Sequence, residues 1–334
     1  MTHKNYTIPI FIPELACPFQ CLYCDQRKIS GKSSIPNEDE VTQIILAHLN
    51  TIPKQAHIEL GFFGGNFTGI DKTEQEKYLK LVQPYLDSGA IQNIRCSTRP
   101  DYINHEVLQL LKKYRVGTIE LGAQSMDDEV LKKSKRGHTV ADTLNAAKLI
   151  REYEINLGLQ MMIGLPGDTK QKAILTARKI IEAGADNTRI YPTLVIKNTK
   201  LEEMYHQGRY QPLTMEKAVD WTAAVYKIFE QSEVKVLRIG LHPSEGLLDG
   251  SDLVAGPFHP SFRELVLTEI WRKKLSDIKS DSDSITITVN PKELNYAVGY
   301  YASNKKMLSK KFKSVKFGIN NNLANSDYEL DYHR

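Results

Sequence analysis

Three cysteines crowd into eight residues near the start of the sequence, at a spacing typical of metal ligands. They read Cys17-Pro-Phe-Gln-Cys21-Leu-Tyr-Cys24. Three thiolates on one tight loop can converge on one inorganic centre, and cysteine thiolates are the usual protein ligands of iron–sulfur clusters. Because a four-iron cluster with three protein ligands keeps one iron open, the pattern predicts a cluster that can bind another molecule.

Two other interpretations of these cysteines stay open. Structural zinc normally takes four ligands, and the nearest histidines, His3 and His57, do not form a ligand-like pair. Three unrelated buried thiols are the second alternative, although a free cysteine usually occurs singly in a core. The fourth cysteine, Cys96, falls inside a predicted strand and is interpreted as such a structural thiol.

Length and composition indicate a globular protein of one large domain, or of one large and one small domain. The sequence has 334 residues, a net charge of +4, 41% apolar and 25% charged residues. We find no run of about 18 apolar residues, so no membrane span is expected. The N-terminal apolar run leads straight into the cysteines and is interpreted as a strand, not a signal peptide. Clustered thiols favour a reducing compartment, so the expected location is the cytoplasm.

Strand and helix patterns alternate through the first two thirds of the sequence. Apolar, β-branched runs predict strands at 7–12, 57–63, 91–97, 118–122, 155–162 and 188–196. Helical periodicity lies between them, at 41–49, 74–86, 105–113, 140–153 and 169–183. This order predicts an α/β fold with a parallel sheet and outer helices. Six such units fit a partial (β/α)6 TIM-like barrel, in which the loops after the strands share one face.

The last third has a different pattern. A helix and a strand are expected first, then an irregular Gly/Pro-rich segment at 241–260 and another helix at 262–274. A polar linker at 279–284 precedes a predicted strand, a helix at 291–311 and a last strand. We therefore expect a core barrel at 1–245 and a C-terminal region at 246–334, with a small α+β strand–helix–strand module from about 285. His242 and His259 fall in the Gly/Pro-rich segment, but their spacing shows no role.

Polar and glycine-rich motifs follow the predicted strands. Gly64-Gly65-Asn66 comes after the second strand, where paired glycines let the backbone approach a ligand; a simple glycine turn is the alternative. Further motifs follow later strands, at Ser97–Pro100, Glu120–Ser125, Arg136–Thr139 and Gly164–Gly167. Each motif can reach the same mouth of the barrel. The sequence has no phosphate-binding loop and no dinucleotide fingerprint.

C-x3-C-x2-C with an aromatic residue before the last cysteine resembles the signature of the radical S-adenosylmethionine (SAM) superfamily. The resemblance implies a [4Fe–4S] cluster whose open iron binds the amino and carboxylate groups of SAM. The reduced cluster then donates an electron, and SAM breaks to methionine and a 5′-deoxyadenosyl radical that takes hydrogen from a substrate. It also implies an electron donor such as flavodoxin or ferredoxin.

The same resemblance assigns residues to SAM. Tyr23 and Gly164 would border the adenine, Gln124 and Ser125 would lie beside the ribose, and Arg136 would lie near the carboxylate. An arginine fork suits a carboxylate. Other readings remain for three of them: Tyr23 as a core aromatic, Ser125 as a cap of the next helix, and Arg136 as a surface charge.

Gly64, Gly65 and Asn66 would contact the SAM amino group by this resemblance. The superfamily often has glutamate where this sequence has Asn66, so the contact would come from a neutral amide oxygen. Ser97 is assigned to the same cofactor site.

The order of motifs over about residues 8–200 resembles the branch that holds the radical SAM domain of the Elongator catalytic subunit and the oxygen-independent coproporphyrinogen oxidases. The cysteine spacing is shorter than in that subunit, and only about 90 residues follow the barrel. Acetyl transfer is therefore not expected. The sequence is most similar to bacterial Elongator-like radical SAM proteins without an acetyltransferase domain, and this likeness does not fix a reaction.

A lysine cluster near the C-terminus hints at the substrate. Six lysines occur within twelve residues without an acidic residue: Lys305, Lys306, Lys310, Lys311, Lys313 and Lys316. Such a surface can bind RNA phosphates, with tRNA the first candidate; a solvated basic face is the alternative.

Two function classes remain. One is a radical SAM enzyme acting on RNA or a small metabolite, and the other is a non-catalytic iron–sulfur protein that senses redox state or binds RNA. A zinc-binding RNA module is a distant third. The SAM motifs favour the enzyme, because a sensor needs the cysteines but not Gly64–Asn66 or Arg136.

Overall fold

The computed structural model describes residues 5–12, 21–25, 28, 34–279 and 282–333. The chain divides into two compact units. The barrel unit comprises Met1–Met215 and Val225–Phe258, and the C-terminal unit comprises Glu216–Ala224 and His259–Arg334.

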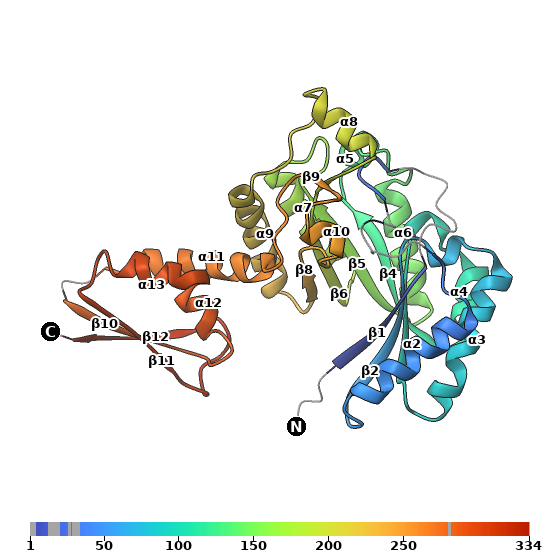
Figure 1. The fold of residues 1–334 in the computed structure, drawn as a ribbon, viewed down its shortest axis with the longest axis horizontal. Coiled ribbons are helices and arrows are strands. Elements are labelled where there is room, and N and C mark those ends of the chain that lie inside the picture. The colour runs from blue at the N-terminus through green and yellow to red at the C-terminus, as the bar shows by residue number, and fades with distance from the viewer. Residues whose placement is uncertain (1–4, 13–20, 26–27, 29–33, 280–281, 334) are drawn as a thin grey trace. The chain divides into compact units, whose positions relative to one another are not determined.

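A seven-stranded parallel sheet forms the centre of the barrel unit (Figure 1), in the order β1-β2-β3-β4-β5-β6-β8. Its strands are β1 (Asn5–Phe11), β2 (His57–Phe63), β3 (Asn93–Thr98), β4 (Val116–Gln124), β5 (Asn156–Ile163), β6 (Asn187–Pro192) and β8 (Lys235–Ile239). All neighbouring pairs are parallel. The predicted partial (β/α)6 TIM-like barrel is confirmed.

Helices cover the outer face of this curved sheet. They are α2 (Glu38–Thr51), α3 (Lys72–Asp87), α4 (His105–Lys113), α5 (Asp128–Lys133), α6 (Val140–Glu152) and α7 (Lys170–Glu182). Two further helices follow, α8 (Lys200–His206) and α9 (Met215–Glu230). Local signals start them: Asn37 and Thr139 form capping boxes at α2 and α6, which satisfy free N–H groups of the first turn. Val41 and Ile45 bury one stripe of α2, so the apolar spacing sets which face packs inward.

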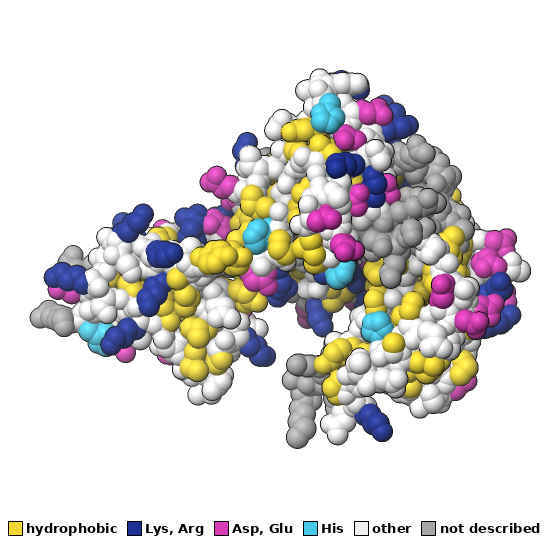
Figure 2. All heavy atoms as spheres, in the orientation of Figure 1, with side chains coloured by type: hydrophobic (Ala, Val, Ile, Leu, Met, Phe, Trp, Pro, Cys, Tyr) yellow, Lys and Arg dark blue, Asp and Glu magenta, His cyan; other side chains and the backbone are white. Residues whose placement is uncertain are grey.

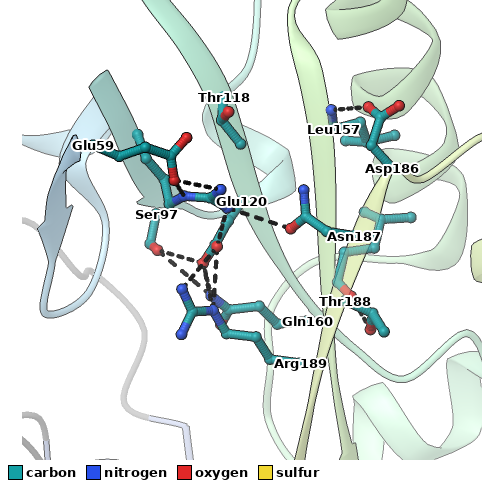
Figure 3. Close-up of polar contacts among 12 residues, drawn as sticks. Glu59, Ser97, Thr118, Glu120, Leu157, Gln160, Asp186, Asn187, Thr188 and Arg189 are labelled. Carbon is teal, nitrogen blue, oxygen red and sulfur yellow. Dashed lines mark hydrogen bonds and ion pairs between the residues drawn. The ribbon is translucent and has the colours of Figure 1, made fainter. Parts of the chain in front are cut away.

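Side chains alternate between the two faces of the strands, and this alternation separates the core from the site. Leu60, Ile94 and Ile119 are fully buried on the helix-covered face. Their neighbours Glu59 and Glu120 point to the inner face, where charged side chains meet (Figure 3). The sheet therefore buries an apolar layer outside and carries polar groups inside.

The predicted strand at 188–196 is wrong in its second half. β6 ends at Pro192, which has no N–H to continue a ladder. Beyond it, β7 (Val195–Ile196) pairs antiparallel with β9 (Leu253–Ala255) in a separate small sheet. The segment predicted as irregular therefore contains β9 and also a short helix, α10 (Glu245–Leu248).

The C-terminal unit contains a three-stranded sheet in the order β11-β10-β12 and helices α11 (Phe262–Ser276), α12 (Leu294–Val298) and α13 (Ser303–Leu308). β10 (Ser284–Val289) runs parallel to β11 (Ser314–Ile319) and antiparallel to β12 (Tyr328–His333). Trp271 and Leu275 of α11 pack with Ile287 of β10 in an apolar core. The predicted module lacked β12, so it is a three-stranded unit.

The helix predicted at 291–311 is wrong, because it is broken in the middle. Gly299 has a φ of +88° and ends α12, and the next helix starts only at Ser303. Tyr301 and Ala302 between them also have left-handed φ values, +51° and +57°, which non-glycine residues seldom adopt. Among the described residues, no helix is long and apolar enough to cross a membrane.

Candidate functional site

A cavity of about 870 Å³ opens on the inner face of the barrel unit. Side chains of β1 to β6 and of β8 line it, together with the loops that follow the strands. Loops after parallel strands share one edge of the sheet, which is where barrel enzymes carry their chemistry. This cavity gathers most of the residues that the sequence singled out.

Cys21 and Cys24 both line the cavity. The backbone N–H of Cys24 donates to the carbonyl of Cys21 at 3.2 Å, so the two cysteines share a tight turn. Leu22 between them fixes this turn: its N–H donates to the Ser134 carbonyl at 3.2 Å, and its carbonyl accepts from the Leu201 N–H at 2.7 Å. Cys17 lies outside the described residues. The described part of the chain shows no group of three ligating side chains.

Arg136 connects the cysteine turn to the sheet. Its Nη1 lies 3.4 Å from Cys21 Sγ, and its Nη2 donates to the Gly122 carbonyl at 2.9 Å. Gly122 makes this possible, because a Cβ there would stand 2.8 Å from Nη2. Arg136 is buried and lines the cavity, so the surface-charge reading fails. A guanidinium beside sulfur suits an anionic thiolate ligand.

Tyr23 is buried in an apolar cluster with Leu165 and Val195, and it also lines the cavity. Burial raises the pKa of the Tyr23 phenol well above its usual value. The ring therefore presents a neutral, mostly apolar surface next to the cysteines. Both the core role and the adenine contact are compatible with this position.

The glycine motif after β2 is bent in a way that needs glycine. Gly64 and Gly65 have φ values of +104° and +142°, and a Cβ on Gly64 would stand 3.0 Å from the backbone of Ile12. Asn66 Oδ1 accepts from Thr98 Oγ1 at 2.6 Å and from the Arg99 N–H at 3.3 Å. These bonds use both lone pairs of the oxygen, so Asn66 ties the ends of β2 and β3 together. Its contact with SAM stays a prediction.

Gln124 combines an unpartnered buried acceptor with a strained backbone. Its Oε1 is buried and has no hydrogen-bond partner among the residues that the structure describes. Its backbone φ is +64°, which is strained for a non-glycine residue. An unsatisfied buried acceptor on a strained residue commonly marks a functional site. Gln124 and Ser97 both line the cavity.

Ser125 and Gly164 do not line the cavity. Ser125 Oγ accepts from the Asp127 N–H at 3.3 Å, next to the start of α5, while Asp127 itself caps that helix. Gly164 has a φ of +76°; its N–H donates to Asp168 and its carbonyl accepts from the Tyr210 hydroxyl at 2.7 Å. Both residues hold loops in place, and their SAM contacts stay predictions.

An inner charged layer beneath the cavity was missed by the sequence reasoning. Glu120 is fully buried and accepts from Arg95, Arg189 and Gln160 (Figure 3). Arg95 also pairs with Glu59 at 3.0 Å. Burial alone would raise the pKa of Glu120, but the charges of Arg189 and Arg95 outweigh it and the pKa is lowered. The period-two spacing of charged residues in the strands was the signal that could have found this layer.

The geometry fits a cofactor of the expected kind. Gly64 and Gly65 line the cavity, Gln124 offers an unused acceptor, and Cys21 and Cys24 face the same space. The two histidines that the sequence left open differ in place. His242 lines the cavity, whereas His259 belongs to the C-terminal unit and packs edge-on against Tyr300.

Comparison with curated proteins finds relatives among tRNA-modifying and haem-related proteins. The tRNA uridine(34) acetyltransferase of Dehalococcoides mccartyi is 28% identical over 61% of this chain and 52% of that protein. The heme chaperone HemW of Bacillus subtilis is 26% identical over 58% of this chain and 52% of that protein. Against three such acetyltransferases, the chain spans about half of the relative's length or less.

Solved structures share the fold. The Elp3 of Methanocaldococcus infernus with an N-terminal deletion superposes with a TM-score of 0.65, at 21% identity, over 82% of this chain and 64% of that chain. HydG, a maturase of the [FeFe]-hydrogenase, gives a TM-score of 0.54 at 15% identity, over 79% of this chain and 55% of that chain.

Two family models match the sequence. The model of the radical SAM C-terminal domain matches residues 185–272, and the model of the radical SAM superfamily matches residues 12–180, which is half of the chain. The resemblance carried by the cysteine spacing is thereby confirmed: the chain belongs to the radical SAM superfamily.

Proposed function

We propose that this chain binds SAM beside a [4Fe–4S] cluster held by Cys17, Cys21 and Cys24, and that it starts radical chemistry on a tRNA. The observation that carries the proposal is a single cavity lined by Cys21, Cys24 and the unsatisfied Gln124 within a radical SAM barrel. When bound, the reduced cluster supplies the electron that cleaves SAM.

The residues of the chain have separate tasks in this proposal. Arg136 fixes the cysteine turn against β4 through its contacts with Cys21 and Gly122. Tyr23 would supply an apolar wall, and Gln124 Oε1 would accept a hydrogen bond from a hydroxyl group of the ligand. The Gly64–Gly65 turn lets the ligand approach the backbone, which Asn66 holds rigid through Thr98.

The tRNA part of the proposal rests on two observations. Several relatives are tRNA uridine(34) acetyltransferases, and the C-terminal unit exposes basic side chains (Figure 2). The structure separates the six lysines of the cluster. Lys311 donates to the Ser276 carbonyl at 2.6 Å and Lys313 pairs with Asp283 at 2.8 Å. The other four, Lys305, Lys306, Lys310 and Lys316, are exposed and are the better candidates for phosphate contacts.

Fluorescence anisotropy with bulk tRNA at several salt concentrations tests this part. We expect binding that weakens steeply with salt, because each phosphate contact releases counterions. The triple change Lys306→Gln, Lys310→Gln and Lys316→Gln should reduce the slope of log K against log salt by about two to three. A matched triple change of exposed lysines in the barrel unit, Lys72, Lys80 and Lys148, should leave it unchanged. No binding at low salt would remove RNA as the substrate and favour a small molecule.

The alternative, a non-catalytic iron–sulfur protein, is tested by SAM turnover. With dithionite, the anaerobic cluster-loaded protein should slowly release 5′-deoxyadenosine without any substrate. Arg136→Ala should weaken SAM binding, because the cysteine turn loses its anchor and the cavity its cation. A protein that holds the cluster but neither binds nor cleaves SAM would favour the sensor.

A further inference from the structure

The inner face of the barrel carries more positive than negative charge. Arg95, Arg189 and Arg238 lie on strands of this face. Arg95 pairs with Glu59 and Glu120, and Arg189 pairs with Glu120. Among the residues that the structure describes, no carboxylate lies within ion-pair distance of Arg238, which lines the cavity. Arg238 therefore differs from Arg95 and Arg189 in having no carboxylate partner in this part of the chain.

Arg238 has a neighbouring arginine and a histidine partner, but no carboxylate partner within the described ranges. It lies on β8, in register with Arg189 on β6, so two guanidinium groups are neighbours. Its Nη2 donates to His242 Nδ1 at 3.1 Å. Burial lowers the pKa of Arg238, and the charge of Arg189 acts in the same sense, but an arginine stays charged at neutral pH. A half-buried cation beside another cation costs stability unless an anion joins it.

His242 completes a set of hydrogen-bond donors. Because a guanidinium can only donate, Nδ1 must accept, and the proton of the neutral ring lies on Nε2. Burial, and then the charge of Arg238, lower the pKa of His242, so the ring is neutral at pH 7. Arg238 and His242 both line the cavity. Together they offer it the remaining guanidinium N–H groups and one imidazole N–H.

We propose that Arg238 and His242 form a subsite for an oxyanion, a carboxylate or phosphate group of the substrate that enters the cavity. The inference rests on the proposed function, since it places the substrate in the same cavity as SAM. Charge-assisted hydrogen bonds to an oxyanion are the interactions that arginine makes best. The bound anion also supplies the negative charge that the cavity wall lacks.

The proposed subsite is separate from Arg136, the cation that contacts Cys21. Arg136 reaches Cys21 and the Gly122 carbonyl on β4, whereas Arg238 lies on β8. The strand order puts three strand spacings between β4 and β8, which is about 14 Å across a sheet. A ligand that meets Arg136 with its carboxylate therefore leaves Arg238 for a second molecule, the substrate.

Isothermal titration of the full, cluster-loaded chain tests the subsite, in the absence of SAM and reductant. Inorganic phosphate and malonate serve as the titrated anions, and NaCl keeps the ionic strength constant. We expect saturable binding to the wild type, weakened at least tenfold by Arg238→Gln and several-fold by His242→Ala. Arg178→Gln, an exposed change on α7 away from the cavity, is the matched control and should bind as the wild type. Tighter phosphate binding indicates a phosphorylated substrate, and tighter malonate binding indicates a carboxylate.

Thermal unfolding separates this role from a structural one. If Arg238 only supported the barrel, Arg238→Gln would lower the unfolding temperature, whereas an uncompensated cation predicts an unchanged or higher value. Absence of saturable anion binding, equal binding by Arg238→Gln, or displacement of the anion by SAM would each overturn the subsite. Failure of the proposed function is seen separately, as a cluster-loaded protein that binds these anions but does not cleave SAM.

Discussion

The two units of the molecule place their charges in opposite ways. In the barrel unit, Glu120 is fully buried between Arg95 and Arg189 on the inner face of the sheet. In the C-terminal unit, Ile285, Ile287 and Val289 of β10 pack in an apolar core with α11, and the lysines lie outside. Both sheets follow the same period of two. The alternation of side chains along a strand therefore fixes which residues share a face of the sheet. The chemistry of those residues decides whether that face becomes an apolar core or a polar site.

Buried ion pairs and apolar cores also contribute differently to the free energy of folding. A buried ion pair gains little net stability, because the desolvation of both charges offsets their attraction, yet breaking it is costly. An apolar core gains stability from the area it removes from water. The barrel unit therefore has a charged inner face in addition to its apolar layer, whereas the core of the C-terminal unit is apolar.

Removal of the buried carboxylate should have the largest effect. Glu120→Ala leaves Arg95 and Arg189 without their shared partner, and we expect a loss of about 3–5 kcal/mol in the free energy of unfolding, as for other broken buried pairs. Urea denaturation measures it. Glu152→Ala on the outer face of α6 is the control and should change stability far less. A small effect at Glu120 would show that the charged layer is hydrated like a surface.

Truncating a side chain of the apolar core in the C-terminal unit should have the next largest effect on stability. Leu275 is fully buried in the C-terminal unit, and Leu275→Ala should cost about 3 kcal/mol through lost burial and a new cavity. The iron content per folded protein should stay that of the wild type, since the cysteines belong to the barrel unit. Loss of iron in this variant would contradict the division of tasks between the units.

A half-buried carboxyl of the barrel unit, Asp168, should make stability depend on pH. Burial raises the pKa of Asp168 to about 6, above its value in the unfolded chain. The folded state therefore binds more protons between about pH 4 and pH 6, and stability falls as the pH rises through this range. We expect a contribution of about 2 kcal/mol, lost above pH 6. Unfolding curves of the wild type and Asp168→Asn from pH 4 to 7 should diverge by this amount; parallel curves would refute the raised pKa.

Removing a surface charge of the C-terminal unit should have the smallest effect on stability. Lys313 and Asp283 form an exposed ion pair at 2.8 Å, and such pairs contribute less than about 1 kcal/mol. Lys313→Gln should change the unfolding midpoint by no more than the experimental error, and added salt should not enlarge the change. A loss comparable to that of Leu275→Ala would mean that surface charge also stabilises this unit.

Spacing along the sequence was enough to predict most strands of the barrel sheet, its outer helices and the turn from Cys21 to Cys24, because each depends on near neighbours. What depends on distant residues was not predicted. The bonds from Thr98 and Arg99 that occupy Asn66 come from the next strand. Arg238 and Arg189 become neighbours only when β8 pairs with β6. The break in the helix predicted at 291–311 depends on left-handed backbone at Tyr301 and Ala302, which these residue types do not predict.

Anaerobic reconstitution with iron and sulfide, followed by dithionite and SAM, measures whether the chain holds a cluster and cleaves SAM there. We expect about four irons and four sulfides per chain and release of 5′-deoxyadenosine. Cys21→Ala should lose both, and Cys96→Ala should keep both, because Cys96 is buried in the apolar layer, where burial raises its pKa to about 12. Full cluster content in Cys21→Ala, or one zinc in place of the cluster in the wild type, would contradict the account.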